Sequence, residues 1–311
     1  MQALAAIRIG TRGSPLALAQ AHEVRQRLLD AHGLTPGAIT ITVIKTTGDQ
    51  VLDRPLAEIG GKGLFTKEIE EALLANEIDI AVHSMKDMQT ALPDGLMLGA
   101  TLPREDVRDA FVSLQYPSLD AVPAGSAIGT SSLRRQAQIL HTRPDLNVVG
   151  FRGNVQTRLK KLQDGVAVAT ILAVAGLKRL KLEDRITAAI PTEQMLPAVA
   201  QGAIGIEIRS DDVAAAKAIL PLNDPATALA VAAERAFLAR LEGSCRTPIA
   251  GLAEVKDGML SFRGQVLSPD GKISYRAVAS NAAHHAAETG TRAADDILAK
   301  ADPTVIARIH S

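Results

Sequence analysis

The stretch AIGTSSLRRQAQIL, residues 127–140, decides the fold. Its first four residues form a short apolar run that is typical of a buried strand, and LRRQAQIL has the spacing of an amphipathic helix. Ser131 or Ser132 stands between the two, as a serine does at the start of many helices. The stretch therefore predicts a strand, a tight turn and a helix, in that order.

The same alternation continues in both directions up to about residue 220. It predicts strands and helices wound into an α/β architecture with mostly parallel sheets. Further strands are expected at residues 5–10, 39–45, 78–84, 108–114, 146–151, 166–173 and 202–208. Further helices are expected to begin after Ser14, Thr66 and Asn154.

The pattern changes after Asp224 and Pro225. A helix over residues 226–242 is expected to end at Gly243, because glycine often caps helices. Strands at 249–255, 259–268 and 272–280 and a helix over 281–300 follow, which predicts a small antiparallel α+β domain. We expect three domains: an α/β lobe of residues 1–102 and 203–222, an arginine-rich α/β lobe of residues 103–202, and a C-terminal α+β domain of residues 223–311 that carries the Cys245 loop.

The composition argues against several classes of protein. The 34 basic and 34 acidic side chains balance and only 2% of residues are aromatic, so no nucleic-acid partner is expected. The longest apolar stretch, residues 166–176, is shorter than the roughly 18 residues that a membrane span needs. One cysteine cannot form an internal disulfide, and the N-terminus lacks a secretory signal. We expect a cytoplasmic protein with no membrane partner.

Charge is unevenly distributed along the chain. Residues 130–185 hold 11 Lys and Arg against 4 Asp and Glu, whereas residues 50–110 hold 6 against 12. Arginines recur where a predicted strand turns into a helix, and a positive charge there opposes the helix dipole unless an anion is bound. We expect either a polyanionic ligand held by two-point arginine contacts, or arginines that are solvated or paired with acidic side chains. The arginines concerned are Arg12, Arg134, Arg135, Arg152 and Arg158.

The motif HSMKD, residues 83–87, closes a predicted strand. Lys86 could form a Schiff base, and Asp87 could act as a base or stabilise a cation. Alternatively, the two form a structural ion pair. The glycine-rich stretch IGGKGLF, residues 59–65, ends at Phe65. It lacks the Ser or Thr that follows Gly-Lys in a phosphate-binding loop. We therefore expect a flexible loop that could act as a lid.

Among the histidines and the single cysteine, Cys245 is the one candidate for a reactive side chain. The seven histidines are scattered and no paired cysteines or HExxH motif occur, so no metal site is expected. Cys245 lies in LEGSCRTPIAG, residues 241–251, just after a predicted helix. It precedes Arg246, whose charge would favour the thiolate. Cys245 is therefore either a reactive cysteine or an inert buried side chain.

Eight motifs, taken in order, closely resemble the porphobilinogen deaminase family. They are TRGSPLALAQ, GGKGLFTKEIE, DIAVHSMKD, GTSSLRRQAQ, RGNVQTRL, ILAVAGLKRL, PAVAQGAIGIE and LEGSCRTPI, and the resemblance runs from about residue 7 to residue 250. It implies two lobes like those of periplasmic binding proteins, with the active cleft between them, and a third small domain. This agrees with the expected α/β lobes and the antiparallel sheet near the C-terminus.

The resemblance also implies an activity, that of a transferase in tetrapyrrole and haem biosynthesis. Members of the family join four porphobilinogen molecules head to tail, release ammonia at each step and hydrolyse the product to hydroxymethylbilane. They are usually cytosolic monomers. In the family, a cysteine in this loop carries a dipyrromethane cofactor through a thioether bond, and the resemblance assigns that role to Cys245.

The remaining site residues follow from the same resemblance. Asp87 matches the catalytic aspartate, and the many arginines match groups that bind the acetate and propionate carboxylates of pyrrole rings. Implied contacts of the cofactor are Lys86, Asp87, Thr130, Ser132, Arg134, Arg135 and Arg158. Implied contacts of the substrate are Arg12, Ser14, Arg152, Arg179 and Phe65.

Two other functions stay open at this point. A bilobal anion-binding solute receptor, or the effector domain of a regulator, would share the lobes and the arginines. It would need neither Asp87 nor Cys245. An enzyme that forms a Schiff base on Lys86 is the second alternative.

Overall fold

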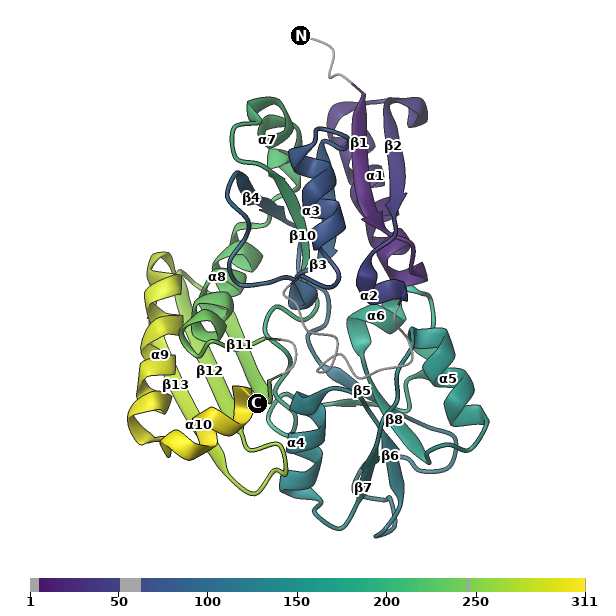
Figure 1. Cartoon of the computed structure of the whole chain (residues 1–311), viewed down its shortest axis with the longest axis vertical. Coiled ribbons are helices and arrows are strands. Elements are labelled where there is room, and N and C mark those ends of the chain that lie inside the picture. Colours follow the sequence, from purple (N-terminus) through teal and green to yellow (C-terminus); the bar gives the residue numbers. More distant parts are fainter. Residues whose placement is uncertain (1–5, 51–62, 245–246, 311) are drawn as a thin grey trace. The chain divides into compact units, whose positions relative to one another are not determined.

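The computed structural model describes residues 6–50, 63–244 and 247–310 (Figure 1). They form two compact units. The first contains the chain up to Arg104 together with Ala203–Ala228, and the second contains Glu105–Gly202 and the chain from Leu229 onward. The division into three domains that the sequence predicts stays a prediction. No helix in these described ranges is long and apolar enough to cross a membrane.

The first unit is built on a five-stranded sheet with the order β2-β1-β3-β10-β4 (Figure 1). β1 runs parallel to β2 and β3, whereas β10 is antiparallel to both β3 and β4. In chain order the elements are β1 (Ile7–Arg12), α1 (Pro15–His32), η1 (Pro36–Ala38), β2 (Ile39–Ile44), α2 (Thr47–Gln50), α3 (Lys67–Leu74), β3 (Ile80–Ser84), η2 (Met85–Asp87), β4 (Leu96–Thr101), β10 (Ile204–Arg209), α7 (Val213–Ile219) and η4 (Leu220–Leu222).

Helices cover both faces of this sheet. Ile80 and Val82 of β3 pack in one apolar cluster with α1 and α7, and Ala81 packs in another with α3. Because successive strand residues point to opposite faces, α1 and α3 lie on opposite sides. β3 is therefore buried on both faces, as its apolar run predicts.

The second unit contains another five-stranded sheet, with the order β7-β6-β8-β5-β9. β6 runs parallel to β7 and β8, and β5 is antiparallel to β8 and β9. Its elements are β5 (Asp109–Ser113), β6 (Ala127–Gly129), α4 (Leu133–Thr142), β7 (Asn147–Val149), α5 (Val155–Gln163), β8 (Ala169–Ala173), α6 (Val174–Arg179), η3 (Glu183–Arg185) and β9 (Ala188–Ile190).

The C-terminal part of this unit is an antiparallel sheet, β11-β12-β13, packed on helices. Phe237 of α8 and Phe262 of β12 meet at its centre with their ring centroids 4.9 Å apart. The elements are α8 (Pro225–Arg240), β11 (Ile249–Lys256), β12 (Met259–Leu267), β13 (Ser274–Ala282), η5 (Ala283–His285), α9 (Ala286–Lys300) and α10 (Pro303–His310). The predicted small α+β arrangement is confirmed.

Two predictions about the sheets were wrong. Neither five-stranded sheet is mostly parallel, because two of the four pairings in each are antiparallel. Strands β4 and β9 were not predicted. A short run of apolar residues predicts a strand. Which strand it pairs with, and whether the pairing is parallel or antiparallel, depends on how distant parts of the chain are connected.

The predicted end of α8 also needs correction. The N–H of Gly243 bonds to the carbonyl of Leu238 and the N–H of Glu242 to that of Ala239, so Glu242 occupies the left-handed position with φ 52°. Gly243 stands one residue later. A Cβ there would lie 2.5 Å from the terminal side-chain atoms of Leu238 and Ile249, which would have to shift.

Close packing of α9 against α8 generates a stability prediction. A Cβ on Gly290 would lie 1.9 Å from the carbonyl oxygen of Ala233, a backbone atom that cannot rotate away. We expect Gly290→Ala to lower the free energy of unfolding by about 1 to 3 kcal/mol, measured by urea denaturation. Gly37→Ala is the control, since a Cβ there meets no atom within 4 Å. Equal stability of the two variants would contradict the packing.

Candidate active site

Site residues in the first unit gather at the carboxyl ends of two parallel strands. A pocket here is lined by Arg12, Ser14, Phe65, His83, Ser84 and Asp87, among others. Because β1 and β3 run parallel, the turns that follow them open at the same edge of the sheet. The sequence predicted Arg12, Ser14, Phe65 and Asp87, and the structure brings these four together in one pocket.

Local structure fixes the positions of these side chains. Ser14 caps α1, its hydroxyl accepting the N–H of Ala17 at 3.2 Å. The guanidinium of Arg12 lies 4.1 Å from the ring centroid of Phe65, a cation–π contact. The rest of the predicted lid, residues 59–62, lies outside the described residues.

Asp87 ends the short helix η2 directly after β3. Its side chain is half-buried and lines the pocket. Among the described residues, no side chain or backbone group forms a hydrogen bond or ion pair with its carboxylate. A carboxylate held in this way keeps its negative charge available to a cation in the pocket. Lys86 precedes it in η2 and is also half-buried.

In the second unit the site residues again follow parallel strands. Thr130, Ser132, Arg134 and Arg135 follow β6, Arg152 and Arg158 follow β7, and Arg179 ends the helix after β8. These three strands are parallel neighbours, so the three segments begin at one edge of the sheet. The predicted starts of α4 and α5 are confirmed. Ser132 accepts the N–H of Arg135 at 3.4 Å, and Asn154 accepts that of Thr157 at 2.9 Å.

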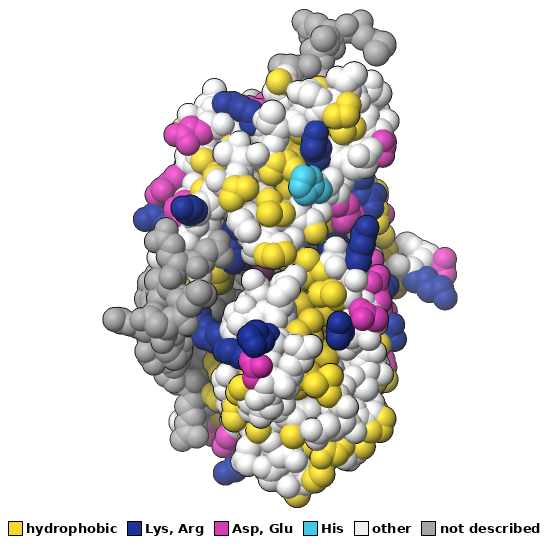
Figure 2. Space-filling model, turned by 90° about the vertical axis from the view of Figure 1, so that its right-hand side faces the viewer, with side chains coloured by type: hydrophobic (Ala, Val, Ile, Leu, Met, Phe, Trp, Pro, Cys, Tyr) yellow, Lys and Arg dark blue, Asp and Glu magenta, His cyan; other side chains and the backbone are white. Residues whose placement is uncertain are grey.

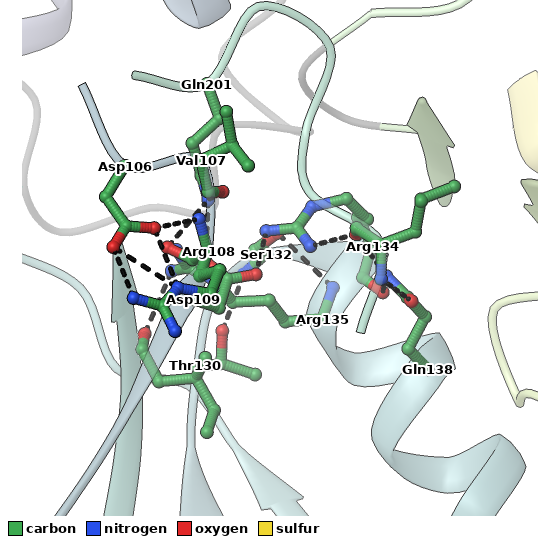
Figure 3. Close-up of polar contacts among 12 residues, drawn as sticks. Asp106, Val107, Arg108, Asp109, Thr130, Ser132, Arg134, Arg135, Gln138 and Gln201 are labelled. Carbon is green, nitrogen blue, oxygen red and sulfur yellow. Dashed lines mark hydrogen bonds and ion pairs between the residues drawn. The ribbon is translucent and has the colours of Figure 1, made fainter. Parts of the chain in front are cut away.

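Arg134 and Arg135 are buried around a residue that the sequence reasoning missed, Asp109 (Figure 3). Nη2 of Arg134 lies 2.8 Å from one carboxylate oxygen of Asp109. Nε and Nη2 of Arg135 donate to the other at 3.2 and 2.6 Å. Gln201 donates to the same oxygen at 3.0 Å. We call these four residues the arginine cluster. The signal for Asp109 in the sequence was its charge at the start of the apolar run DAFVS, residues 109–113.

The arginine cluster is also tied to the backbone. Arg134 donates to the carbonyl of Leu196 at 2.7 Å, and Arg135 donates to that of Ile171 at 2.9 Å. Gln201 donates a second hydrogen bond to the carbonyl of Val107 at 2.8 Å. The two guanidinium groups are therefore fixed relative to the sheet.

In the arginine cluster, burial and the opposite charges nearby shift the pKa values of Asp109 and Arg134 in opposite directions. Burial alone would raise the pKa of Asp109, but the charges of Arg134 and Arg135 and the hydrogen bonds from Arg135 and Gln201 hold it well below its usual value. Burial lowers the pKa of Arg134, against the attraction of Asp109. Arginine stays protonated in proteins, so two positive charges face one negative charge. The cluster carries a net charge of about +1.

Two of the other predicted arginines, Arg158 and Arg179, donate hydrogen bonds to backbone carbonyls. Nε of Arg158 donates to the carbonyl of Gly153 and Nη2 of Arg179 to that of Gly202, both at 2.9 Å. Nη1 of Arg152 is buried and finds no hydrogen-bond partner in the described chain, and the same holds for Nε of Arg134. These are donors that an anion could satisfy. Thr130 accepts the N–H of Ser132 at 3.2 Å.

Cys245 and Arg246 lie outside the described residues. The residues flanking them are joined, because the Thr247 hydroxyl donates to the carbonyl of Ser244 at 2.7 Å and accepts its N–H at 3.0 Å.

On the face shown in Figure 2, basic and acidic side chains are interspersed, in keeping with the balanced composition.

Comparison with known proteins decides the family. The model of the porphobilinogen deaminase dipyromethane cofactor binding domain matches residues 7–217, and that of the porphobilinogen deaminase C-terminal domain matches residues 228–299. The chain belongs to the porphobilinogen deaminase family. It is 60% identical to the porphobilinogen deaminase of Paracoccus denitrificans, with 95% of this chain and 94% of the relative covered. It is 57% identical to the chloroplastic porphobilinogen deaminase of Pisum sativum, with 96% and 83% covered.

The chain also has weak similarity to solved structures of binding proteins. The methionine binding protein MetQ is 14% identical with a TM-score of 0.43, covering 70% of this chain and 89% of its own. The VFT2 domain of Bordetella pertussis BvgS is 15% identical with a TM-score of 0.41, covering 70% and 84%. The alternative of a solute receptor or effector domain is not favoured, because both family models and the relatives at 57–60% identity are porphobilinogen deaminases.

The arginine cluster generates a prediction about stability. Asp109→Asn keeps the shape but leaves two buried cations without a counter-charge, so we expect the free energy of unfolding at pH 7 to fall by about 3 to 5 kcal/mol. Because the pKa of Asp109 is lowered in the folded protein, its contribution is present above the unfolded value of about 3.8 and is lost as the pH falls below it. The gap between parent and variant should therefore narrow on acidification below pH 4.

Urea denaturation of both proteins between pH 3 and pH 7 measures this gap. Asp145→Asn serves as the control, because Asp145 pairs with Arg143 at the surface and such pairs contribute little. If Asp109→Asn were as stable as Asp145→Asn at pH 7, the carboxylate of Asp109 would not neutralise the arginine cluster.

Proposed function

We propose that the chain, a member of the porphobilinogen deaminase family, condenses four porphobilinogen molecules head to tail and hydrolyses the product to hydroxymethylbilane, releasing ammonia at each condensation. This makes it a transferase of tetrapyrrole biosynthesis. The observation that carries the proposal is the buried excess of positive charge in the arginine cluster. Each pyrrole ring of the substrate brings an acetate and a propionate, so a growing chain of rings is a polycarboxylate.

The residues present fit a dipyrromethane group. Two guanidinium groups that are 4% and 5% exposed share one carboxylate, and buried N–H groups of Arg134 and Arg152 lack a partner in the described chain. Burying uncompensated charge is costly. A ligand with carboxylates would supply the missing negative charge and accept from these donors. The family model that matches residues 7–217 is itself described as a dipyromethane cofactor binding domain.

We propose that the cofactor is joined to Cys245 by a thioether and that it supplies the primer for elongation. Arg134, Arg135 and Arg158 would hold its carboxylates, and Thr130, Ser132 and Lys86 would add polar contacts. The chain's own contribution is orientation: Asp109, Gln201 and two backbone carbonyls fix the arginine pair before any ligand binds. Binding then costs little side-chain entropy.

Arg12, Ser14, Arg152, Arg179 and Phe65 would contact the incoming substrate. Arg12 is the best placed of these to bind a substrate carboxylate beside Asp87, because both line one pocket. The stacked ring of Phe65 limits the directions in which the Arg12 guanidinium can point. One arginine and one aspartate thus offer opposite charges to two ends of the same small molecule.

Asp87 would perform the electrostatic part of the reaction. Loss of ammonia leaves positive charge on the pyrrole ring of the substrate, and a carboxylate aimed at that charge lowers the barrier. Asp87 suits this task because no described residue neutralises it.

The proposal further includes a cytoplasmic enzyme that acts as a monomer, with no nucleic-acid or membrane partner.

Turnover of porphobilinogen by the purified chain tests the proposal. We expect ammonia and hydroxymethylbilane to form, and Asp87→Asn to reduce the rate by about 100- to 1000-fold, since it removes one positioned charge. Asp94→Asn, an exposed aspartate in the same unit, should retain the parent rate. A parent-like rate in Asp87→Asn would show that another group stabilises the charge, and an inactive parent chain would refute the proposed reaction.

A further inference from the structure

A second group of buried ionisable side chains lies beside the Asp87 pocket. Glu70 of α3, His83 of β3 and Glu207 of β10 are 4%, 5% and 0% exposed. Nε2 of His83 lies 3.1 Å from a carboxylate oxygen of Glu207. We call these three residues the acid–histidine cluster. All three lie in the sequence motifs quoted above, but the sequence analysis gives them no role and the proposed role of Asp87 does not use them.

The sheet brings these side chains together. In the antiparallel pairing of β3 with β10, His83 stands opposite Gly205 and Glu207 stands opposite Ala81. His83 and Glu207 are therefore diagonal neighbours on one face, and the Met85 side chain fills the space beside Gly205. This is the face that α3 covers, and α3 adds Glu70. The pairing of β10 with β4 shifts register between Ile206 and Glu207, and such irregularities re-aim side chains.

The acid–histidine cluster is short of hydrogen-bond donors. Nε2 of His83, both carboxylate oxygens of Glu207, Oε1 of Glu70 and the Thr66 hydroxyl are buried without a hydrogen-bond partner in the described chain. Two carboxylates at these depths cannot both stay ionised cheaply beside one imidazole. Burial raises the pKa of Glu70, against the Thr66 hydroxyl, and the charge of Glu207 raises it further. The cluster thus places two buried carboxyl groups beside one imidazole, and Glu207 is the one whose oxygen lies 3.1 Å from His83.

His83 connects this buried pair to the pocket. His83 is among the residues that line the pocket, together with Arg12 and Asp87, and its Nε2 lies 3.1 Å from a carboxylate oxygen of Glu207. The second ring nitrogen, Nδ1, has no hydrogen-bond partner among the described residues. An imidazole with a buried carboxylate on one side and a reaction pocket on the other is a common arrangement for proton transfer.

We propose that His83 carries protons for the reaction in the Asp87 pocket, with Glu207 as its buried carboxyl partner and Glu70 as a second buried carboxyl group of the cluster. The proposal rests on the proposed function. Each condensation breaks a carbon–nitrogen bond, whose electron pair leaves with ammonia, and the new carbon–carbon bond displaces a proton from a pyrrole carbon. Ammonia takes up one proton and leaves as ammonium. His83 would accept the displaced proton and return it, so atoms and charge balance without a further reactant.

Kinetics of the holoprotein test the proposal first. We expect His83→Ala to lower kcat by about 100-fold or more, with little change in KM, and to lose one limb of the kcat–pH profile. Added imidazole should restore part of kcat in His83→Ala, because residue 83 lines the pocket, but not in His83→Gln, whose side chain fills the space. His32→Gln is the matched control, since His32 is half-buried in the same unit and bonds to the carbonyl of Ala218. Parent-like kinetics in His83→Ala, or the absence of rescue, would overturn the proposal.

Nitrogen-15 NMR of the histidine rings provides a readout that does not depend on turnover. We expect one ring N–H signal protected from exchange with water, absent in His83→Gln, retained in His32→Gln and changed in Glu207→Gln. If Glu207→Gln fails to fold, the spectra of the other two variants still decide whether such a proton exists. Its absence would overturn the proposal. Failure of the parent chain to release ammonia from porphobilinogen would instead refute the proposed function, so the two failures are distinguishable.

Discussion

The carboxylate of Asp109 is the constraint on which the second unit depends. It is fully buried at the start of β5 and neutralises two arginines that would otherwise repel each other within the protein. One carboxylate is enough to fold the arginine pair into place, but it leaves about one positive charge in excess. Under the proposed function, an anionic ligand would neutralise this excess. Structure and ligand binding would then depend on the same four side chains.

The first unit combines both signs of charge. Its pocket presents Arg12 and Asp87, and two glutamates and a histidine are buried beside it. The second unit thus holds fixed positive charge that suits carboxylate-bearing rings. Under the proposed function, the first unit would add Arg12 for a substrate carboxylate and Asp87 for the charge that develops as an amine leaves. The residues concerned lie at the carboxyl ends of parallel strands in both sheets.

Much of this arrangement could be predicted from the sequence, because caps and apolar periods are local signals. Ser14, Ser132 and Asn154 each begin a helix as expected, and the motifs after β1, β3 and β6 placed the pocket and arginine residues correctly on their turns. The antiparallel halves of the sheets could not be predicted, since pairing depends on distant parts of the chain. Asp109, Glu70 and Glu207 were missed for a related reason. A single acidic residue is read as a surface residue unless its buried partner is known, and those partners are 13 to 137 residues away in sequence.

The most direct measurement is the intact mass of the purified, denatured protein, followed by mapping of the peptide that contains Cys245. A thioether survives denaturation, whereas a noncovalent ligand is lost. If the arginine cluster serves a tethered polycarboxylate, the chain is heavier than its sequence by one dipyrromethane unit, the added mass lies on Cys245, and Cys245→Ala lacks it. Fully active protein with an unmodified Cys245 would contradict this account.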